Sequence, residues 1–143
     1  MVKKIFIGGA VTDYDKTILN HYDTLKNTIL ADCANFEITT PTDVKQYALS
    51  IKNCVENERE LYAKMVEFDL RKVREADIFI ADVTNKSTGL GLELGVALEM
   101  GTDVLLYAQK GANTSNMLAC FAPIFYYENL EEKTNDILSK LKG

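Results

Sequence analysis

Apolar residues along the chain occur in short runs that alternate with segments of helical spacing. Uninterrupted runs predict buried strands, and apolar residues three or four positions apart predict amphipathic helices. Strands are predicted at residues 3–8, 36–39, 77–81, 104–108 and 123–127. Helices are predicted at residues 14–31, 58–73, 91–100, 114–121 and 130–141, with Gly101 capping the third of them. Residues 40–43 are typical of a loop, and the pattern at residues 44–53 is ambiguous.

This alternation predicts an α/β fold: a single doubly wound domain, Rossmann or flavodoxin-like, with a parallel sheet of about five strands. We expect one domain over residues 1–143, because this is a common domain length and no linker interrupts the chain. Ligands of such folds bind beyond the carboxyl ends of the strands. The loops at residues 8–10, 82–91 and 109–116 are therefore the places where a site is expected.

Composition and charge argue against several classes of protein. No apolar run approaches the roughly 20 residues that span a bilayer, so no membrane association is expected. The net charge of −5 argues against binding a nucleic acid polymer. Cys33, Cys54 and Cys120 are odd in number and far apart, and the chain has one histidine. We therefore expect reduced thiols, a cytoplasmic protein without an export signal, and no metal site.

The segment from Ala81 to Gly95, ADVTNKSTGLGLELG, carries the most information. A predicted strand ends there, a polar loop follows, and two glycines precede a predicted helix whose first N–H groups are free to bind a ligand. Glu93 is predicted in the first turn of this helix. It is either a catalytic carboxylate or a residue that only complements the helix dipole, and spacing alone favours neither.

Several other positions can be considered by residue type. Asp69 lies among apolar helical positions, where it is either a solvated surface residue or a second carboxylate beside Glu93. Gly8 and Gly9 follow the first strand, where they form either a turn or a ligand loop. His21 is predicted to be an ordinary helix residue. The tyrosines at positions 14, 22, 47 and 62 belong either to the core or to a surface that stacks on a base.

Three motifs in order resemble the nucleoside 2-deoxyribosyltransferase family, which includes the 2′-deoxynucleoside 5′-phosphate N-hydrolases. They are Asp69-Leu70, the stretch ADIFIADV at residues 76–83, and SxGxGxELG at residues 87–95. The resemblance runs from the first strand to about Leu118. It implies that Glu93 is a nucleophile that forms a glycosyl ester, and that Asp69 assists departure of the base. A carboxylate and a proton donor suit an oxocarbenium-like transition state with a poor leaving group.

The same resemblance implies a set of residues around the substrate. They are Gly8, Gly9, Ala10, Ser87, Gly89 and Gly91, with Ser115 and Asn116 in a segment that a neighbouring subunit lends to the site. Family transferases tend to have an aspartate at the position of Ser87, whereas the nucleotide hydrolases have a serine for the phosphate. Ser87 and Ser115 therefore favour a 5′-monophosphate. Asn116 matches the amide that transferases use at a 5′-hydroxyl.

Two positions depart from the family pattern. Phe6 stands where members commonly have a tyrosine that hydrogen-bonds the nucleophile. Residues 8–13, GGAVTD, replace a loop that carries an arginine in the nucleotide hydrolases. No arginine is available there for a phosphate, and Asp13 would oppose one.

Four functions therefore remain open. Hydrolysis of 2′-deoxynucleoside 5′-monophosphates is slightly favoured over transfer of deoxyribose between bases. The alternatives from other classes are a non-catalytic nucleotide-binding module and a TIR-like enzyme that cleaves NAD. The expected ligand is a small deoxynucleoside or deoxynucleotide, with no cofactor and no metal, and the resemblance implies a homodimer or a higher homo-oligomer.

Overall fold

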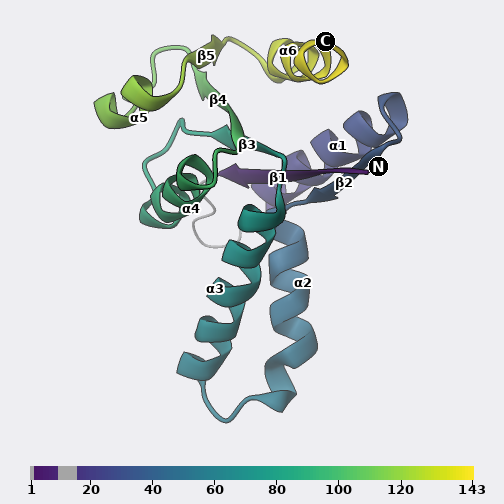
Figure 1. The fold of residues 1–143 in the computed structure, drawn as a ribbon, viewed down its shortest axis with the longest axis vertical. Helices are drawn as coiled ribbons and strands as arrows, with labels where there is room; N and C mark the ends of the chain where they lie inside the picture. The colour runs from purple at the N-terminus through teal and green to yellow at the C-terminus, as the bar shows by residue number, and fades with distance from the viewer. Residues whose placement is uncertain (1, 10–15) are drawn as a thin grey trace.

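The fold is an α/β domain with one five-stranded sheet in which every strand is parallel to its neighbours (Figure 1). The computed structural model describes residues 2–9 and 16–143. The strands are β1 (Lys3–Gly9), β2 (Phe36–Thr39), β3 (Ile78–Asp82), β4 (Asp103–Gln109) and β5 (Ile124–Tyr127). Their order, β2-β1-β3-β4-β5, is that of flavodoxin-like folds and confirms the predicted fold class.

The helices that connect the strands are α1 (Lys16–Asp32), α2 (Pro41–Ile51), α3 (Glu58–Glu75), α4 (Thr88–Glu99), α5 (Asn116–Phe121) and α6 (Leu130–Lys142). A short 3-10 helix, η1 (Lys52–Cys54), follows α2. Among the described residues, no helix is both long and apolar enough to cross a bilayer. The predicted start of the first helix at Tyr14 lies outside the described residues.

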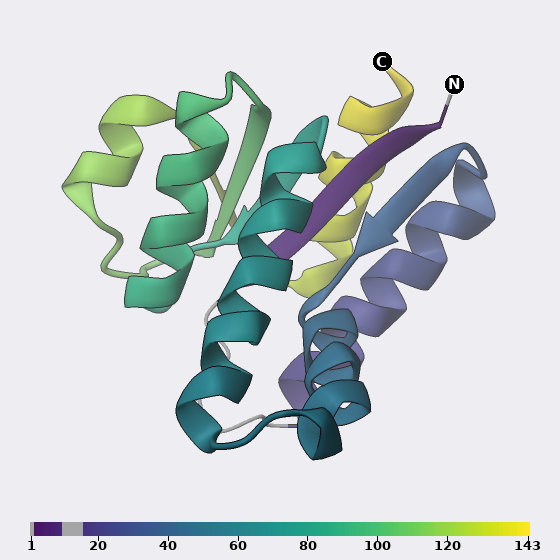
Figure 2. The same cartoon turned by 60° about the horizontal axis from the view of Figure 1, so that its bottom comes forward.

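Each face of the sheet is covered by helices, with one apolar core on each side (Figure 2). On one face, Tyr22, Leu25 and Ile29 of α1 and Ile137 of α6 pack on β1, β3 and β4. On the other face, α3, α4 and α5 cover the sheet around the fully buried Phe79. The carboxyl ends of β1 and β3 lie side by side at the point where the strand order reverses. Ligands of this fold class bind at that point.

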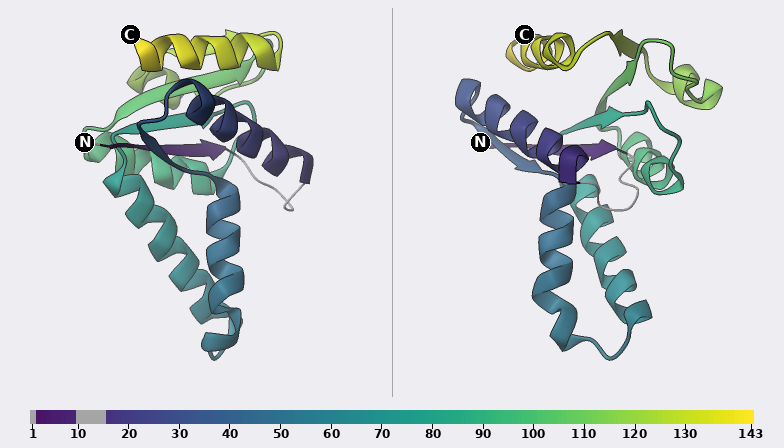
Figure 3. Two further views of the ribbon diagram at one scale, coloured as in Figure 1. Left: turned by 90° about the vertical axis from the view of Figure 1, so that its right-hand side faces the viewer. Right: turned by 180° about the vertical axis from the view of Figure 1, so that it is seen from behind.

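The prediction of a loop at residues 40–43 was wrong, because Thr40 is the N-cap of α2 and Pro41 is its first residue. Proline suits this position, since its missing N–H would be unpaired there in any case. Asp43 completes the cap by accepting a hydrogen bond from the Thr40 amide at 2.8 Å. Helices α2 and α3 then run side by side as an arm that extends beyond the sheet (Figure 3).

Helix α4 also begins earlier than predicted, at Thr88 rather than Gly91, with Ser87 as its N-cap. The predicted end was correct. Gly101 adopts a φ of 71°, and its amide donates to the Leu98 carbonyl while the Thr102 amide donates to the Ala97 carbonyl. This is the Schellman arrangement that glycine favours after a helix.

Candidate active site

A cavity of about 330 Å³ opens at the carboxyl ends of β1 and β3, on the face covered by α3 and α4. Its walls come from β1, both helices of the arm and the start of α4. It is lined by Phe6, Gly8, Gly9, Pro41, Val44, Lys45, Met65, Val66, Asp69, Ser87, Gly89, Leu90 and Glu93. The cavity thus brings together both predicted catalytic carboxylates and four of the predicted substrate-binding residues.

Asp69 from α3 and Glu93 from α4 face each other across this cavity. Burial raises the pKa of Glu93 above its ordinary value, and the charge of Asp69 and a hydrogen bond between the two carboxyl groups raise it further. Burial also raises the pKa of Asp69, while the hydrogen bond from Glu93 opposes that shift. Two half-buried carboxyl groups that share a hydrogen bond do not readily both ionise, so the pair tends to hold one proton at neutral pH.

The position of Glu93 within α4 differs from the prediction. Because α4 begins at Thr88, Glu93 lies in the second turn of the helix rather than the first. The field of the helix dipole falls off within the first turn. An interaction with the helix dipole therefore explains little about the position of Glu93. Its raised pKa beside Asp69 is instead typical of residues at functional sites.

Gly8 and Gly9 form the floor of the cavity where β1 ends, and both lack room for a side chain. A Cβ at Gly8 would lie 3.0 Å from the Phe79 ring. A Cβ at Gly9 would overlap the hydroxyl of Tyr22. Packing alone therefore requires these glycines, whether or not a ligand approaches them. Ala10, the third residue predicted for this loop, lies outside the described residues.

Ser87 and Gly89 line the cavity at the N-terminus of α4. The Ser87 hydroxyl accepts a hydrogen bond from the Leu90 amide at 3.3 Å and so caps the helix. A Cβ at Gly89 would find only this hydroxyl nearby, at 3.9 Å, so the glycine leaves open space at the helix terminus. Free N–H groups and the positive end of the helix dipole make such a place suited to an anion.

The remaining predicted residues lie away from Glu93, on the other side of α4. Gly91 and Ser115 line a second cavity of about 490 Å³ between α4 and α5. Asn116 is the first residue of α5 and is exposed. Within one chain these three residues do not line the cavity of the two carboxylates. The role of Ser115 and Asn116 remains a prediction that needs a second subunit, and that of Gly91 beside Ser87 also stays a prediction.

The arm supplies the part of the cavity wall that the sequence did not reveal. Pro41, Val44 and Lys45 of α2 and Met65 and Val66 of α3 line it. The sequence indicated a loop at residues 40–43 and an ambiguous pattern at residues 44–53, so this wall was not predicted. Proline 41 was the sequence signal that marked the start of a helix.

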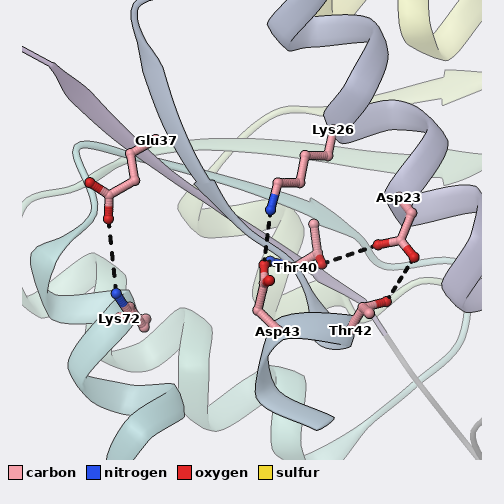
Figure 4. A network of polar contacts seen from close by, with 7 residues as sticks. All are labelled: Asp23, Lys26, Glu37, Thr40, Thr42, Asp43 and Lys72. Carbon is pink, nitrogen blue, oxygen red and sulfur yellow. Dashed lines mark hydrogen bonds and ion pairs between the residues drawn. The ribbon is translucent and has the colours of Figure 1, made fainter. Parts of the chain in front are cut away.

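Polar contacts hold the start of α2 against α1 (Figure 4). The Thr42 hydroxyl donates to Asp23 at 3.1 Å, and the Lys26 ammonium pairs with Asp43 at 3.3 Å. Thr40, 1% exposed, lies between these two pairs. This network fixes the helix whose first turns form the cavity wall.

Other predicted residues take structural places. Tyr22 of α1 is buried in the core, Tyr47 stacks on Phe68 with ring centroids 4.3 Å apart, and Tyr62 is exposed. His21, for which the sequence suggested no partner, lies 3.3 Å from the Lys133 ammonium. Tyr14 lies outside the described residues. Among the described residues, no three His, Cys, Asp or Glu side chains are arranged to hold a metal ion.

Solved structures with this fold include enzymes that act on nucleosides and nucleotides. The CMP N-glycosidase BcmB of Clostridium botulinum is 18% identical, with a TM-score of 0.60 and 98% of each chain covered. A 2-deoxyribosyltransferase from Bacillus psychrosaccharolyticus is 21% identical, with a TM-score of 0.66, covering 94% of this chain and 90% of that one. At these identities the similarity establishes the fold alone. No curated protein sequence matches the chain.

A match at the level of sequence families goes further. The sequence model described as nucleoside 2-deoxyribosyltransferase matches residues 10–136, which is most of the chain and contains both Asp69 and Glu93. The chain therefore belongs to the nucleoside 2-deoxyribosyltransferase family, a family of N-glycosidases and deoxyribosyltransferases that act on nucleosides or nucleotides.

Proposed function

We propose that this protein cleaves or exchanges the N-glycosidic bond of 2′-deoxynucleosides or their 5′-monophosphates, with Glu93 as nucleophile and Asp69 as acid and base. The observation that carries this proposal is the half-buried, hydrogen-bonded pair of carboxyl groups in one cavity, each with a raised pKa. Pairs of titratable groups in a shared site are typical of acid–base catalysis.

The shared proton gives each carboxyl its role. In the free protein Glu93 holds this proton and donates it in a hydrogen bond to Asp69. When the proton moves to Asp69, Glu93 becomes an ionised nucleophile and Asp69 an acid, without any exchange with solvent. Glu93 attacks the anomeric carbon, the bond to the base breaks, and the electron pair stays on the base nitrogen, which takes the proton from Asp69. Asp69 then removes a proton from water, which attacks the glycosyl ester and releases Glu93.

Hydrolysis of 5′-monophosphates is the form of the reaction that we favour. Ser87 places a hydroxyl rather than a carboxylate at the N-terminus of α4, where a phosphate is stabilised by free N–H groups. Transfer of deoxyribose to a second base differs only in the group that attacks the ester. An added free base that becomes part of a new nucleoside would identify the transferase.

The test uses purified protein, a panel of 2′-deoxynucleosides and their 5′-monophosphates, and chromatography of the products. We expect free base from the monophosphates. Glu93→Gln should lower turnover by at least about a hundredfold, because the amide cannot attack. Glu99→Gln, on the exposed side of the same helix, is the matched control and should keep wild-type turnover.

Mass spectrometry after rapid acid quenching gives a second test. The peptide that contains Glu93 should gain the mass of one deoxyribosyl group, with its 5′-phosphate when the substrate is a monophosphate, in the wild type and not in Glu93→Gln. Ligand binding without any product or adduct would instead favour the non-catalytic module. Release of nicotinamide from NAD would favour the TIR-like alternative.

We also propose that a second copy of the chain completes the site. Ser115 and Asn116 lie away from Glu93, while Met117 and Phe121 near them expose more than 60% of their surface. Such apolar exposure between α4 and α5 is typical of a contact surface. Mixing Glu93→Gln with Asn116→Ala should restore activity in mixed dimers, because one of their two sites has both native residues. A fully active monomer would contradict this arrangement.

A further inference from the structure

Four polar side chains from four elements meet at the carboxyl edge of the sheet, on the face opposite the Glu93 cavity. Asp82 ends β3 and Tyr127 ends β5, while His21 comes from α1 and Lys133 from α6. The Lys133 ammonium lies 2.8 Å from the Asp82 carboxylate, and the Tyr127 hydroxyl donates to the same carboxylate oxygen at 2.5 Å. Lys133 is only 1% exposed, so this is a buried ion pair. The proposed reaction uses none of these groups.

The second oxygen of Asp82 binds the backbone of the loop that leads into α4. It accepts a hydrogen bond from the Thr84 amide at 3.0 Å. The Thr84 hydroxyl in turn accepts from the Gln109 amide at 2.9 Å, and the Val83 amide donates to the Tyr107 carbonyl at 2.7 Å. The loop at residues 83–87 is thus anchored at its start to β4 and to Asp82. Its last residue, Ser87, lines the Glu93 cavity.

We infer that Asp82 is a positioning residue that sets the place of Ser87, and with it the recognition of the substrate's 5′ group, through the loop at residues 83–87. This inference rests on the proposed function, in which the 5′ end of the substrate lies at Ser87. Asp82 touches no substrate in this arrangement, because it lies on the other face of the sheet.

The chemistry of the cluster requires an ionised carboxylate. Asp82 accepts from three donors, namely the Lys133 ammonium, the Tyr127 hydroxyl and the Thr84 amide. Burial would raise the pKa of Asp82, but the Lys133 charge and these hydrogen bonds lower it below its ordinary value. An asparagine has one acceptor oxygen and would turn an NH₂ group toward one of the donors. Asp82→Asn therefore loosens the anchor with little change in volume.

The test compares substrates that differ only at the 5′ position: a 2′-deoxynucleoside 5′-monophosphate, the 2′-deoxynucleoside and the 2′,5′-dideoxynucleoside with the same base. We expect Asp82→Asn to lower kcat/KM about tenfold or more for the substrate with the preferred 5′ group, the loss that one charge-assisted hydrogen bond implies. For the 2′,5′-dideoxynucleoside, which has no group for Ser87 to bind, the change should stay below about twofold.

Asp136→Asn is the matched control. Asp136 also accepts from a tyrosine hydroxyl, Tyr107 at 2.7 Å, and pairs with a lysine, Lys140 at 2.8 Å. No described hydrogen bond joins Asp136 itself to the loop, which binds the Tyr107 backbone carbonyl and not its side chain. It should lower kcat/KM for all three substrates equally or not at all. Thr84→Ala, which removes the link to Gln109, should reproduce the pattern of Asp82→Asn and serves if that variant does not fold.

Equal losses on all three substrates for Asp82→Asn and Thr84→Ala would overturn the inference, because a merely structural residue does not distinguish 5′ groups. Amide hydrogen exchange without substrate provides a second readout that needs no activity. Exchange over residues 83–90 should rise in Asp82→Asn and not in Asp136→Asn, and unchanged exchange would also overturn the inference. A wild-type chain that turns over none of the substrates refutes the proposed function instead, and the exchange result then still decides whether Asp82 holds the loop.

Discussion

Replacing Lys133 with methionine measures how much the buried ion pair with Asp82 contributes to stability. The Lys133 side chain is 2% exposed and that of Asp82 13%, and their charged atoms lie 2.8 Å apart. Methionine keeps most of the apolar stem and removes the ammonium. The variant leaves Asp82 with two of its three donors, the Tyr127 hydroxyl and the Thr84 amide.

The expected loss follows from these contacts. Removing one partner of a buried pair costs roughly 3–5 kcal/mol, because the other charge remains buried. We expect the lower end, about 3 kcal/mol, since Asp82 keeps two hydrogen bonds and part of its side chain reaches solvent. For a chain of this length, that loss corresponds to a melting temperature lower by roughly 10 °C.

Urea unfolding at neutral pH, followed by far-UV circular dichroism, gives the free energy of unfolding. Lys140→Met is the control, because Lys140 also lies 2.8 Å from an aspartate but its side chain is 44% exposed. An exposed pair of this kind contributes less than about 1 kcal/mol. Equal losses in the two variants would refute the reasoning, because burial would then not determine the cost.

Three further predictions concern other described residues. Burial, and then the charge of Lys133, lower the pKa of His21, so as the pH drops through about 6.5 the unfolded chain binds the proton first and the free energy of unfolding falls. His21→Gln should lessen this fall, measured by urea unfolding between pH 7.5 and 5. An unchanged dependence of the free energy of unfolding on pH would contradict this account. The raised pKa of Glu93 means that the folded chain holds a proton that the unfolded chain releases above pH 4.5, so stability falls as the pH rises. Glu93→Gln should therefore be more stable than the wild type at neutral pH, by a margin that grows with pH, and a margin that shrinks would oppose this account. Gly9→Ala should lower the free energy of unfolding by about 2 kcal/mol or more, because the added methyl overlaps the hydroxyl of Tyr22 in the core. Gly89→Ala should fold normally and raise KM, because its methyl meets only open space beside Ser87. Equal urea midpoints of unfolding for the two variants would count against the clash.

The sequence predicted the strands and most helices because their apolar periodicity reports burial directly. The prediction was wrong at the starts of α2 and α4, because only the few residues at the cap determine where a helix begins. Pro41 has the same local preferences at the first position of a helix and in a turn, so its neighbours had to be weighed together. At α4, Gly89 and Gly91 suggested a loop, although the capping serine had already started the helix.

The site was predicted only in part, because contacts between distant segments leave no local pattern. Glu93 and Asp69 were chosen from motifs, but their proximity depends on α3 packing beside α4. His21 and Lys133 are 112 positions apart, and the local sequence around either residue gives no sign of their contact. The wall formed by Met65 and Val66 was likewise absent from the motifs, because it follows from the direction of the arm.

Helix α4 presents two different surfaces through one short stretch of sequence. Gly89 and Glu93 line the cavity with the two carboxylates, whereas Gly91, Gly95 and Leu98 line the cavity beside α5, and Leu90 lines both. Neighbouring residues of the motif therefore line different cavities, since a helix turns by roughly 100° per residue. A library that varies only positions 91, 95 and 98 would test whether the cavity beside α5 is a contact surface between copies of the chain, while a library at position 89 would test whether that position affects the choice of substrate.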